Sequence, residues 1–314
     1  MTNSAPLRVL SHIPLQLLEP VRKALPDVQL THVPLQGEPP DDVRGEVLLT
    51  HAKGSPNLAA VVARGVRWIH TYGTGVNEFP FDALGKCVLT CSRGASGHPI
   101  AEWTLAVMLA FEKNLPAMWI SEPPKHWSIA GLGSLRGRTL GLVGLGGIGS
   151  EVARLAQAFG MRVRASRRTR APSPIAGVEI VHDLGELVRD ADHLVLAAPV
   201  THATRHVVDA ELLAQVKPGL HLVNIARGAL VDHDALRAAL DDGRVALASL
   251  DCVEPEPVPA GHWLYTHPRV RLSAHISWSA PEALAELIAP FVDNLRRYRA
   301  GEPLEGIVDL EQGY

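Results

Sequence analysis

Three polar segments each follow an apolar run, and together they could perform acid–base chemistry on an anionic substrate. Asn224-Ile-Ala-Arg227 ends the run GLHLVNI, Leu250–Pro257 offers three carboxylates after VALAS, and His275 follows RLSA. An arginine can bind a carboxylate and polarise a carbonyl group, and a histidine can deliver a proton. Because the carboxyl ends of parallel strands meet at one edge of a sheet, we expect these side chains to lie near a common ligand.

A glycine-rich segment, Gly144-Leu-Gly146-Gly-Ile-Gly149, has the spacing of a dinucleotide-binding loop. It lies between an expected strand, Thr139–Val143, and an expected helix, which is the context that the motif requires. Gly144 would permit the tight turn, Gly146 would let backbone amides approach a pyrophosphate, and Gly149 would let the helix pack against the strand. The helix N-terminus would then stabilise the bound anion.

The residues after the next strand predict which dinucleotide binds. Folds that select NAD usually place a carboxylate there, about 20 residues beyond the glycines. Here the strand MRVRA runs into Ser166-Arg167-Arg168-Thr169-Arg170. Guanidinium groups are suited to bidentate contact with a 2′-phosphate, so the sequence favours NADP, with NAD as the second choice. The alternative is that these arginines only solvate a loop.

Short apolar runs alternate with helical patterns along the chain, which is typical of α/β proteins. Five runs between residues 7 and 92 predict one parallel sheet, and six runs between residues 139 and 277 predict a second. The second group lacks apolar–polar alternation, as strands covered on both faces do. Long helices are expected over residues 98–115 and from about Ser279 to Tyr298.

The composition excludes several classes of protein. The chain has 314 residues, 46% of them hydrophobic, which suits about two domains of roughly 150 residues each. Its net charge of −3 argues against nucleic acid or an anionic membrane as the main partner, and no uncharged stretch reaches the roughly 18 residues of a membrane helix. The cysteines, Cys87, Cys91 and Cys252, lack metal-ligand spacing. We therefore expect a cytoplasmic protein without disulfides or a metal.

Ordered motifs along nearly the whole chain resemble those of the D-isomer-specific 2-hydroxyacid dehydrogenase family, which includes glyoxylate/hydroxypyruvate reductases and phosphoglycerate dehydrogenases. These motifs are TYGTGVNEF, PIAEWTLAVMLA, LRGRTLGLVGLGGIG, APVTHATRHVVD, VNIARGALVD, LDCVEPEP and LSAHIS. The resemblance implies an oxidoreductase that transfers a hydride between NADP(H) and a 2-keto acid/D-2-hydroxy acid pair. It also implies a doubly wound Rossmann domain, residues 98–282, inserted into a smaller flavodoxin-like α/β substrate domain, residues 1–97 and 283–314. A homodimer formed through the dinucleotide domain is expected on the same basis.

The resemblance also assigns roles to individual residues. Arg227 would bind the carboxylate and keto oxygen of the substrate, His275 would be the acid/base, and Glu256 rather than Glu254 would pair with His275. Further cofactor contacts are expected from Gly147, Ile148, Thr204, Ile225, Ala226 and Asp251, the last holding the nicotinamide carboxamide. Further substrate contacts are expected from Lys53, Gly73, Thr74, Gly75 and Trp278.

Some of these assignments have alternatives, and so does the function. Thr204 could instead cap a loop, Lys53 could be an exposed cation, and Trp278 could pack against the dinucleotide domain rather than line the substrate pocket. The chain could also be a non-enzymatic dinucleotide-sensing regulator, because some transcriptional corepressors resemble these dehydrogenases, or a structural protein that kept the fold alone. The intact Arg227, Glu256 and His275 argue against the regulator, and failure to bind either dinucleotide would support the structural protein.

Overall fold

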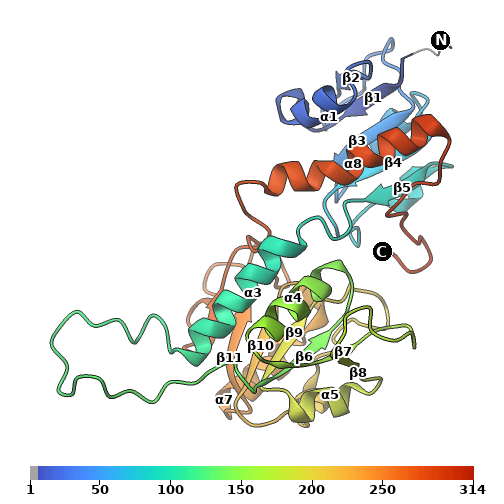
Figure 1. Cartoon of the computed structure of the whole chain (residues 1–314). Helices are drawn as coiled ribbons and strands as arrows, with labels where there is room; N and C mark the ends of the chain where they lie inside the picture. Colours follow the sequence, from blue (N-terminus) through green and yellow to red (C-terminus); the bar gives the residue numbers. More distant parts are fainter. Residues whose placement is uncertain (1–5) are drawn as a thin grey trace. The chain divides into compact units, whose positions relative to one another are not determined.

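Two compact units make up the structure, a computed structural model that describes residues 6–314 (Figure 1). Unit 1 combines the chain up to Ser96 with Ala280–Tyr314, and unit 2 is the intervening Gly97–Ser279. Each unit is built on one parallel sheet, of five strands in unit 1 and seven in unit 2. The expected fold class, a doubly wound α/β unit inserted into a smaller α/β unit, is confirmed.

The sheet of unit 1 has the strand order β2-β1-β3-β4-β5. Its strands are β1 Arg8–Ser11, β2 Gln29–His32, β3 Val47–His51, β4 Trp68–Tyr72 and β5 Val88–Cys91. Each coincides with one of the five apolar runs in the sequence. This order is that of flavodoxin-like sheets, in which the direction of winding reverses between β1 and β3.

Three α-helices, α1 Glu19–Ala24, α2 Leu58–Val62 and α8 Ala283–Ala300, accompany this sheet, with short 3₁₀ segments at Leu15–Leu18 and Phe81–Leu84. The long helix α8 begins later than expected, at Ala283 instead of about Ser279. Pro281 explains the difference, because a proline disfavours helical backbone at the residue before it. Within the core, Phe291 of α8 packs against Trp68, with 5.5 Å between ring centroids.

The sheet of unit 2 has the order β12-β11-β10-β9-β6-β7-β8. The strands are β6 Thr139–Val143, β7 Arg162–Ser166, β8 Val178–Ile180, β9 His193–Leu196, β10 Leu220–Asn224, β11 Val245–Leu250 and β12 Val270–Leu272. Strand β8 was not predicted from the sequence; it is a three-residue edge strand with a single buried residue, Val178. Such a short half-exposed strand leaves no apolar run in the sequence.

Helices lie on unit 2 around strands that are buried on both faces (Figure 1). They are α3 Gly97–Glu112, α4 Gly147–Ala158, α5 Leu184–Asp190, α6 Ala210–Leu213 and α7 His233–Asp241, with 3₁₀ segments at Gly228–Leu230 and Trp263–Tyr265. Aspartates cap three of them; at α7, for example, Asp232 accepts from Asp234 N and Ala235 N. None of the helices in residues 6–314 is long and apolar enough to cross a membrane.

Candidate active site

The glycine loop lies after β6, where the strand order of unit 2 reverses: β6 pairs with β7 on one side and β9 on the other. Gly144 has φ +100°, and a Cβ there would lie 2.7 Å from Ala198 N. A Cβ on Gly149 would collide with the carbonyl oxygen of Gly144. By contrast, no described atom lies within 4 Å of a Cβ built on Gly146. The backbone is therefore packed tightly below the loop and open where a pyrophosphate would approach.

The end of β7 lies directly beside this loop, because Gly144 N donates to Ser166 O at 3.0 Å. Arg167 is half-buried and its Nη1 donates to Pro172 O at 2.9 Å, while Arg168 is exposed. The segment after β7 thus places positive charge, and no carboxylate, next to the glycine loop. Folds that select NAD usually place a carboxylate at this position.

A histidine–carboxylate pair lies at the carboxyl edge of the same sheet. His275 Nδ1 is 2.9 Å from Glu256 Oε2, and Glu256 Oε1 accepts from Val253 N at 3.1 Å. Glu254 faces elsewhere and forms a salt bridge with Arg205 at 2.9 Å. The structure therefore brings Glu256, and not Glu254, to the histidine.

The electrostatics of the pair fix the proton on one ring nitrogen. Burial would raise the pKa of Glu256, but the hydrogen bond and charge of His275, together with Val253 N–H and the charge of Arg227, hold that pKa below its usual range. An ionised carboxylate only accepts hydrogen bonds, so Nδ1 of His275 must carry a proton. Nε2 is then the ring nitrogen that can exchange a proton with a ligand.

Asp251 organises the loop that presents His275. Its buried carboxylate accepts from Ser273 Oγ at 2.6 Å and from the backbone N–H groups of Ile276 and Ser277, each at 2.9 Å. His275 N donates to Asp251 O at 2.9 Å, and His275 itself has φ +54°, in the left-handed region. Oδ2 accepts only one of these bonds, which leaves it an acceptor site for a further donor such as a carboxamide.

Arg227 is positioned by the buried amide of Asn224. Asn224 Nδ2 donates to Arg227 O at 2.8 Å and to Cys252 O at 3.2 Å, which joins the ends of β10 and β11. Gly228 follows, and a Cβ there would collide with the backbone of Val253. The positioning roles of Asn224 and Ser273 were not predicted from the sequence, although a polar side chain at the end of an otherwise apolar strand is the signal that could have identified Asn224.

Cys252, Glu256 and His275 bring potential metal-ligand atoms within 4.8 Å of one another. Burial raises the pKa of the Cys252 thiol far above its usual range, and a protonated thiol is a poor metal ligand. The other two side chains already bind each other. This group of side chains is therefore better suited to proton transfer than to metal binding.

The remaining unit 2 residues singled out from the sequence are held mainly by their own loops. Thr204 Oγ1 accepts from Thr201 N and donates to Pro199 O, both at 2.7 Å, so its hydroxyl caps the loop after β9. Trp278 Nε1 donates to His275 O at 3.0 Å while the indole remains partly exposed. Ile225 is buried, Ala226 N donates to Asn224 Oδ1, and Gly147 and Ile148 begin α4 at the glycine loop.

Residues expected to contact the substrate from unit 1 follow β3 and β4 at the carboxyl edge of its sheet. Gly73 has φ +132° and its carbonyl accepts from Ser92 N, while Thr74 Oγ1 donates to Ser92 O at 3.1 Å. Gly75 comes next in this turn. Lys53 Nζ lies 2.8 Å from Glu78 Oε2, and both side chains are largely exposed. The structure thus gives the ammonium of Lys53 a surface ion pair.

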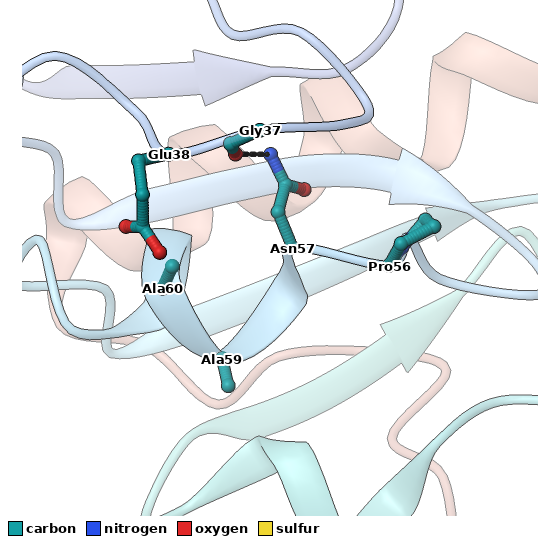
Figure 2. Close-up of a pocket in the computed structure, with 6 residues that line it drawn as sticks. All are labelled: Gly37, Glu38, Pro56, Asn57, Ala59 and Ala60. Carbon is teal, nitrogen blue, oxygen red and sulfur yellow. Dashed lines mark hydrogen bonds between the residues drawn. The ribbon is translucent and has the colours of Figure 1, made fainter.

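A hollow of about 580 Å³ lies elsewhere on unit 1, beside α2 (Figure 2). Asn57 is central to its wall, with Nδ2 donating to Pro34 O and Gly37 O at 2.9 Å and Oδ1 accepting from Ser55 Oγ. The amide therefore holds the segment around Gly37 in place. None of the site residues predicted from the sequence lines this hollow, whose lining residues are Gly37, Glu38, Pro56, Asn57, Ala59 and Ala60.

The larger part of the chain matches a known protein family. Residues 105–277 match the family described as D-isomer specific 2-hydroxyacid dehydrogenase, NAD binding domain. The chain is 32% identical over 223 residues to glyoxylate/hydroxypyruvate reductase A of Photorhabdus laumondii, an alignment that covers 69% of each protein. It is 34% identical over 246 residues to D-3-phosphoglycerate dehydrogenase of Methanocaldococcus jannaschii, covering 76% of this chain and 46% of that protein. The chain thus spans about half the length of that relative.

A solved structure is similar to this chain over nearly its whole length. The D-isomer specific 2-hydroxyacid dehydrogenase from Xanthobacter autotrophicus Py2, in complex with NADPH and MES, matches with a TM-score of 0.82 and 26% identity. The match covers 99% of this chain and 100% of that one. The similarity therefore extends through both units and beyond the residues matched by the family.

Proposed function

We propose that this chain, which belongs to the D-isomer specific 2-hydroxyacid dehydrogenase family, reduces a 2-keto acid to the D-2-hydroxy acid with NADPH, reversibly. The observation that carries the proposal is the pair formed by His275 and Glu256, at 2.9 Å, at the carboxyl edge of the sheet that also bears the glycine loop. Ligands of doubly wound sheets bind at that edge. The match to a glyoxylate/hydroxypyruvate reductase favours small 2-keto acids of that kind as substrates.

The proposed roles follow from the charges and hydrogen bonds of the site. Arg227 binds the carboxylate and keto oxygen of the substrate, because its guanidinium can form two parallel hydrogen bonds. In reduction, protonated His275 gives its Nε2 proton to the keto oxygen, and in oxidation the neutral ring takes the proton back. Glu256 orients the ring and stabilises its charged form. A bound nicotinamide supplies or accepts the hydride.

Residues 98–282 are proposed to bind the dinucleotide, and residues 1–97 with 283–314 the substrate. The pyrophosphate would lie on the amides of Gly147 and Ile148 at the start of α4, beside the open position at Gly146. Asp251 would accept the carboxamide with its remaining acceptor site. Ile225 and Ala226 would line the nicotinamide, and Gly73, Thr74 and Gly75 would bind the substrate carboxylate through their backbone.

NADP(H) is proposed as the preferred dinucleotide, with NAD(H) as the second choice. Ser166, Arg167 and Arg168 lie next to the glycine loop and include no carboxylate to repel a 2′-phosphate. The similar protein from Xanthobacter was crystallised with NADPH, which supports the same preference.

A single set of assays tests the reaction and the cofactor together. The purified protein would be mixed with NADPH or NADH and with glyoxylate, hydroxypyruvate or phenylpyruvate, and the nicotinamide absorbance followed. Turnover faster with NADPH is expected. Binding of NADPH without turnover of any 2-keto acid would instead identify a dinucleotide sensor, and failure to bind either dinucleotide would refute the proposal altogether.

A separate variant tests the proposed contact between the arginines after β7 and the 2′-phosphate of NADPH. Replacing Arg167 and Arg168 with Ala should raise the dissociation constant for NADPH by about tenfold or more, since hydrogen bonds to charged groups contribute roughly 1.5–3 kcal/mol each. The constant for NADH should change little. Arg154→Ala, which removes an arginine from α4 that pairs with Glu151, is the control. Equal weakening of both dinucleotides would disprove the phosphate contact.

A second copy of the chain is the proposed partner. Residues 113–134 form a long loop that extends away from the sheet of unit 2 (Figure 1), and its two ends are joined by Gly133 N donating to Glu112 O and Lys113 Nζ donating to Gly133 O. The loop displays six large hydrophobic side chains that are 41–78% exposed: Met118, Trp119, Ile120, Trp127, Ile129 and Leu132. Exposed apolar surface of this kind marks an interaction site.

Light scattering after size-exclusion chromatography tests this partnership. The protein should have the mass of a dimer, and replacing Trp119 and Trp127 with Ser should shift it towards the 33.8 kDa monomer. Replacing Tyr265, an exposed aromatic residue outside the loop, should leave the mass unchanged. A monomeric wild-type protein at micromolar concentration would contradict the dimer.

A further inference from the structure

The backbone of His275 has a conformation that residues with a side chain rarely adopt. Its φ of +54° lies in the left-handed region, where the Cβ atom crowds the following carbonyl oxygen. Such a conformation persists only where the surrounding contacts hold it. Because φ and ψ set the direction of the Cα–Cβ bond, whatever holds this backbone also sets the direction of the imidazole ring.

The peptide group before His275 is held by the end of β11. Its N–H belongs to His275 and donates to Asp251 O at 2.9 Å. This bond joins two backbone groups, so it orients the peptide plane without the help of a side chain. It therefore restrains φ of His275.

The peptide group after His275 is held at both of its edges by side chains. Its N–H, which belongs to Ile276, donates to Asp251 Oδ1 at 2.9 Å, and its carbonyl, which belongs to His275, accepts from Trp278 Nε1 at 3.0 Å. The N–H and C=O groups of a trans peptide point to opposite sides of one rigid plane. Asp251 and Trp278 thus form a clamp that restrains ψ of His275, and Trp278 supplies its carbonyl half.

A tight turn gives the indole this position. Ser279 N donates to Ile276 O at 2.9 Å, which closes a β-turn with Ser277 and Trp278 as its central residues. Ser277 is buried, whereas Trp278 is 39% exposed and belongs to none of the hydrophobic cores of the described residues. The bond to His275, rather than burial in a core, is therefore the distinctive contact of this indole.

We propose that Trp278 is a positioning residue for the proton transfer: its indole N–H holds the carbonyl of His275, and thereby keeps the imidazole ring directed so that Nε2 meets the keto oxygen. The inference rests on the proposed function, because it concerns the same step. Without the indole N–H, the peptide after His275 can rotate towards the conformations that most residues prefer. A smaller fraction of molecules then presents Nε2 correctly, so kcat falls while substrate and dinucleotide bind as before.

A pair of substitutions tests the indole N–H. Trp278→Met removes the donor and should lower kcat by about five- to tenfold, the effect of losing one hydrogen bond. Trp278→Gln should recover most of that loss, because its amide nitrogen is a donor that lies as many bonds from Cα as the indole nitrogen does. Tyr265→Phe is the control and should keep the wild-type kcat, since Tyr265 is another exposed aromatic residue that donates to a backbone oxygen, Val258 O, at 2.9 Å.

The division of the effect between kcat and KM separates positioning from contact with the substrate. The test uses two 2-keto acids of different size that the wild-type protein reduces, such as glyoxylate and phenylpyruvate. Trp278→Met should lower kcat by the same factor for both, because both receive their proton from His275, and should leave both KM values and the dissociation constant for NADPH near wild type. A loss confined to the larger acid, or a KM that changes with substrate size, would overturn the proposal and make the indole a wall of the substrate pocket.

The other outcomes also decide the matter. Equal kcat values in Trp278→Met and Trp278→Gln would show that the indole N–H has no part in the reaction. Unfolding of both variants, measured by calorimetry, would show that the indole supports the fold of the loop instead of directing His275. Each of these results would overturn the role of Trp278 and leave the proposed function intact, whereas no reduction of any 2-keto acid by the wild-type protein would overturn both.

Discussion

Two histidine–carboxylate pairs lie at opposite edges of the unit 2 sheet and have opposite surroundings. At the carboxyl edge, His275 and Glu256 are 2.9 Å apart and their side chains are 39% and 35% exposed. At the amino edge, His193 and Glu112 are 3.2 Å apart and their side chains are 0% and 3% exposed. The two pairs share residue types and nearly the same distance, so those features do not distinguish a reactive pair from a structural one.

What separates them is whether a ring nitrogen is left for a ligand. His193 uses both nitrogens within the protein, Nε2 on Glu112 and Nδ1 on His221 at 3.0 Å, and His221 in turn is bonded to Ser249 and stacked on Phe111. Burial lowers the pKa of His193 to about 4; the charge of Asp192 opposes this and that of Arg138 adds to it. His193 is thus a neutral packing element, whereas His275 has a polar partner on one side and access to a ligand on the other.

The largest difference between the two pairs is expected in kcat, when His275 and His193 are replaced in turn. His275→Gln should lower kcat by about 10²- to 10⁴-fold, the usual contribution of a general acid, because glutamine cannot supply a proton. The dissociation constant for NADPH and the melting temperature should stay near their wild-type values. Steady-state kinetics and calorimetry would show this, and retention of more than a tenth of the wild-type kcat would remove His275 from the acid/base role.

Replacing the buried His193 should instead change the free energy of unfolding and its dependence on pH. Because the pKa of His193 is lowered to about 4 in the folded protein, only the unfolded chain takes up this proton as the pH falls from about 6.5 towards 4, and stability is lost over that range. One such group corresponds to about 3 kcal/mol, at 1.36 kcal/mol per pKa unit. His193→Gln should therefore flatten the fall in the free energy of unfolding, measured with urea at pH 7, 5.5 and 4.

Turnover per folded molecule provides the complementary measurement on the same variant. It should be close to wild type in His193→Gln, since this side chain lies at the edge of the sheet opposite the candidate site. Two results in His193→Gln would contradict the different roles of the two pairs. One is an unchanged dependence of the free energy of unfolding on pH, and the other is a loss of turnover like that of His275→Gln.

A smaller effect on kcat is expected from a substitution that disturbs the backbone next to the His275–Glu256 pair. Gly228→Ala would drive a Cβ into the backbone of Val253, three residues before Glu256, and overpacking of this kind typically costs about 1–3 kcal/mol. We expect a lower melting temperature and a kcat reduced by about tenfold, because small misplacements of catalytic groups are costly. Gly131→Ala is the matched control, since nothing lies within 4 Å of its Cβ position. Equal behaviour of the two variants would contradict the proposed packing.

The smallest effect should come from the neighbouring glutamate. Glu254 is paired with Arg205 at the surface, and exposed pairs contribute about 0–1 kcal/mol. Glu254→Gln should change kcat by less than about twofold, whereas Glu256→Gln should reduce it clearly because it removes the carboxylate that stabilises the charged imidazole. Parallel kinetics on the two variants would decide between them, and a larger loss in Glu254→Gln would reverse the assignment.

Much of the fold was predictable because it depends on local patterns. Eleven of the strands coincide with apolar runs, and β6 was located to the residue because Thr139–Val143 is apolar and followed at once by glycines. The edge strand β8 was not found, since it buries a single residue and resembles a loop in sequence. The start of α8 was misplaced by the overlooked effect of Pro281.

The candidate site was predictable only in part. The family resemblance singled out Arg227, Glu256 and His275, but nothing in the sequence indicates that Asp251 ties down the loop around His275 through three hydrogen bonds. Nor does the sequence reveal that the Nε2 atoms of His12 and His233 are buried without a hydrogen-bond partner among the described residues, because that depends on what surrounds each ring. Thr204 is engaged in a loop cap and Lys53 in a surface ion pair, the alternatives that the sequence had left open.

The sequence by itself determined the two α/β sheets, the glycine loop and the family, because apolar periodicity and short motifs are written in consecutive residues. Only the tertiary structure decided which of two glutamates meets His275, which histidine–carboxylate pair is buried, and which buried ring nitrogens lack a hydrogen-bond partner among the described residues. Those properties arise where strands distant in sequence are brought side by side, and there burial and hydrogen-bond geometry, rather than residue type, set the charge and accessibility of each group.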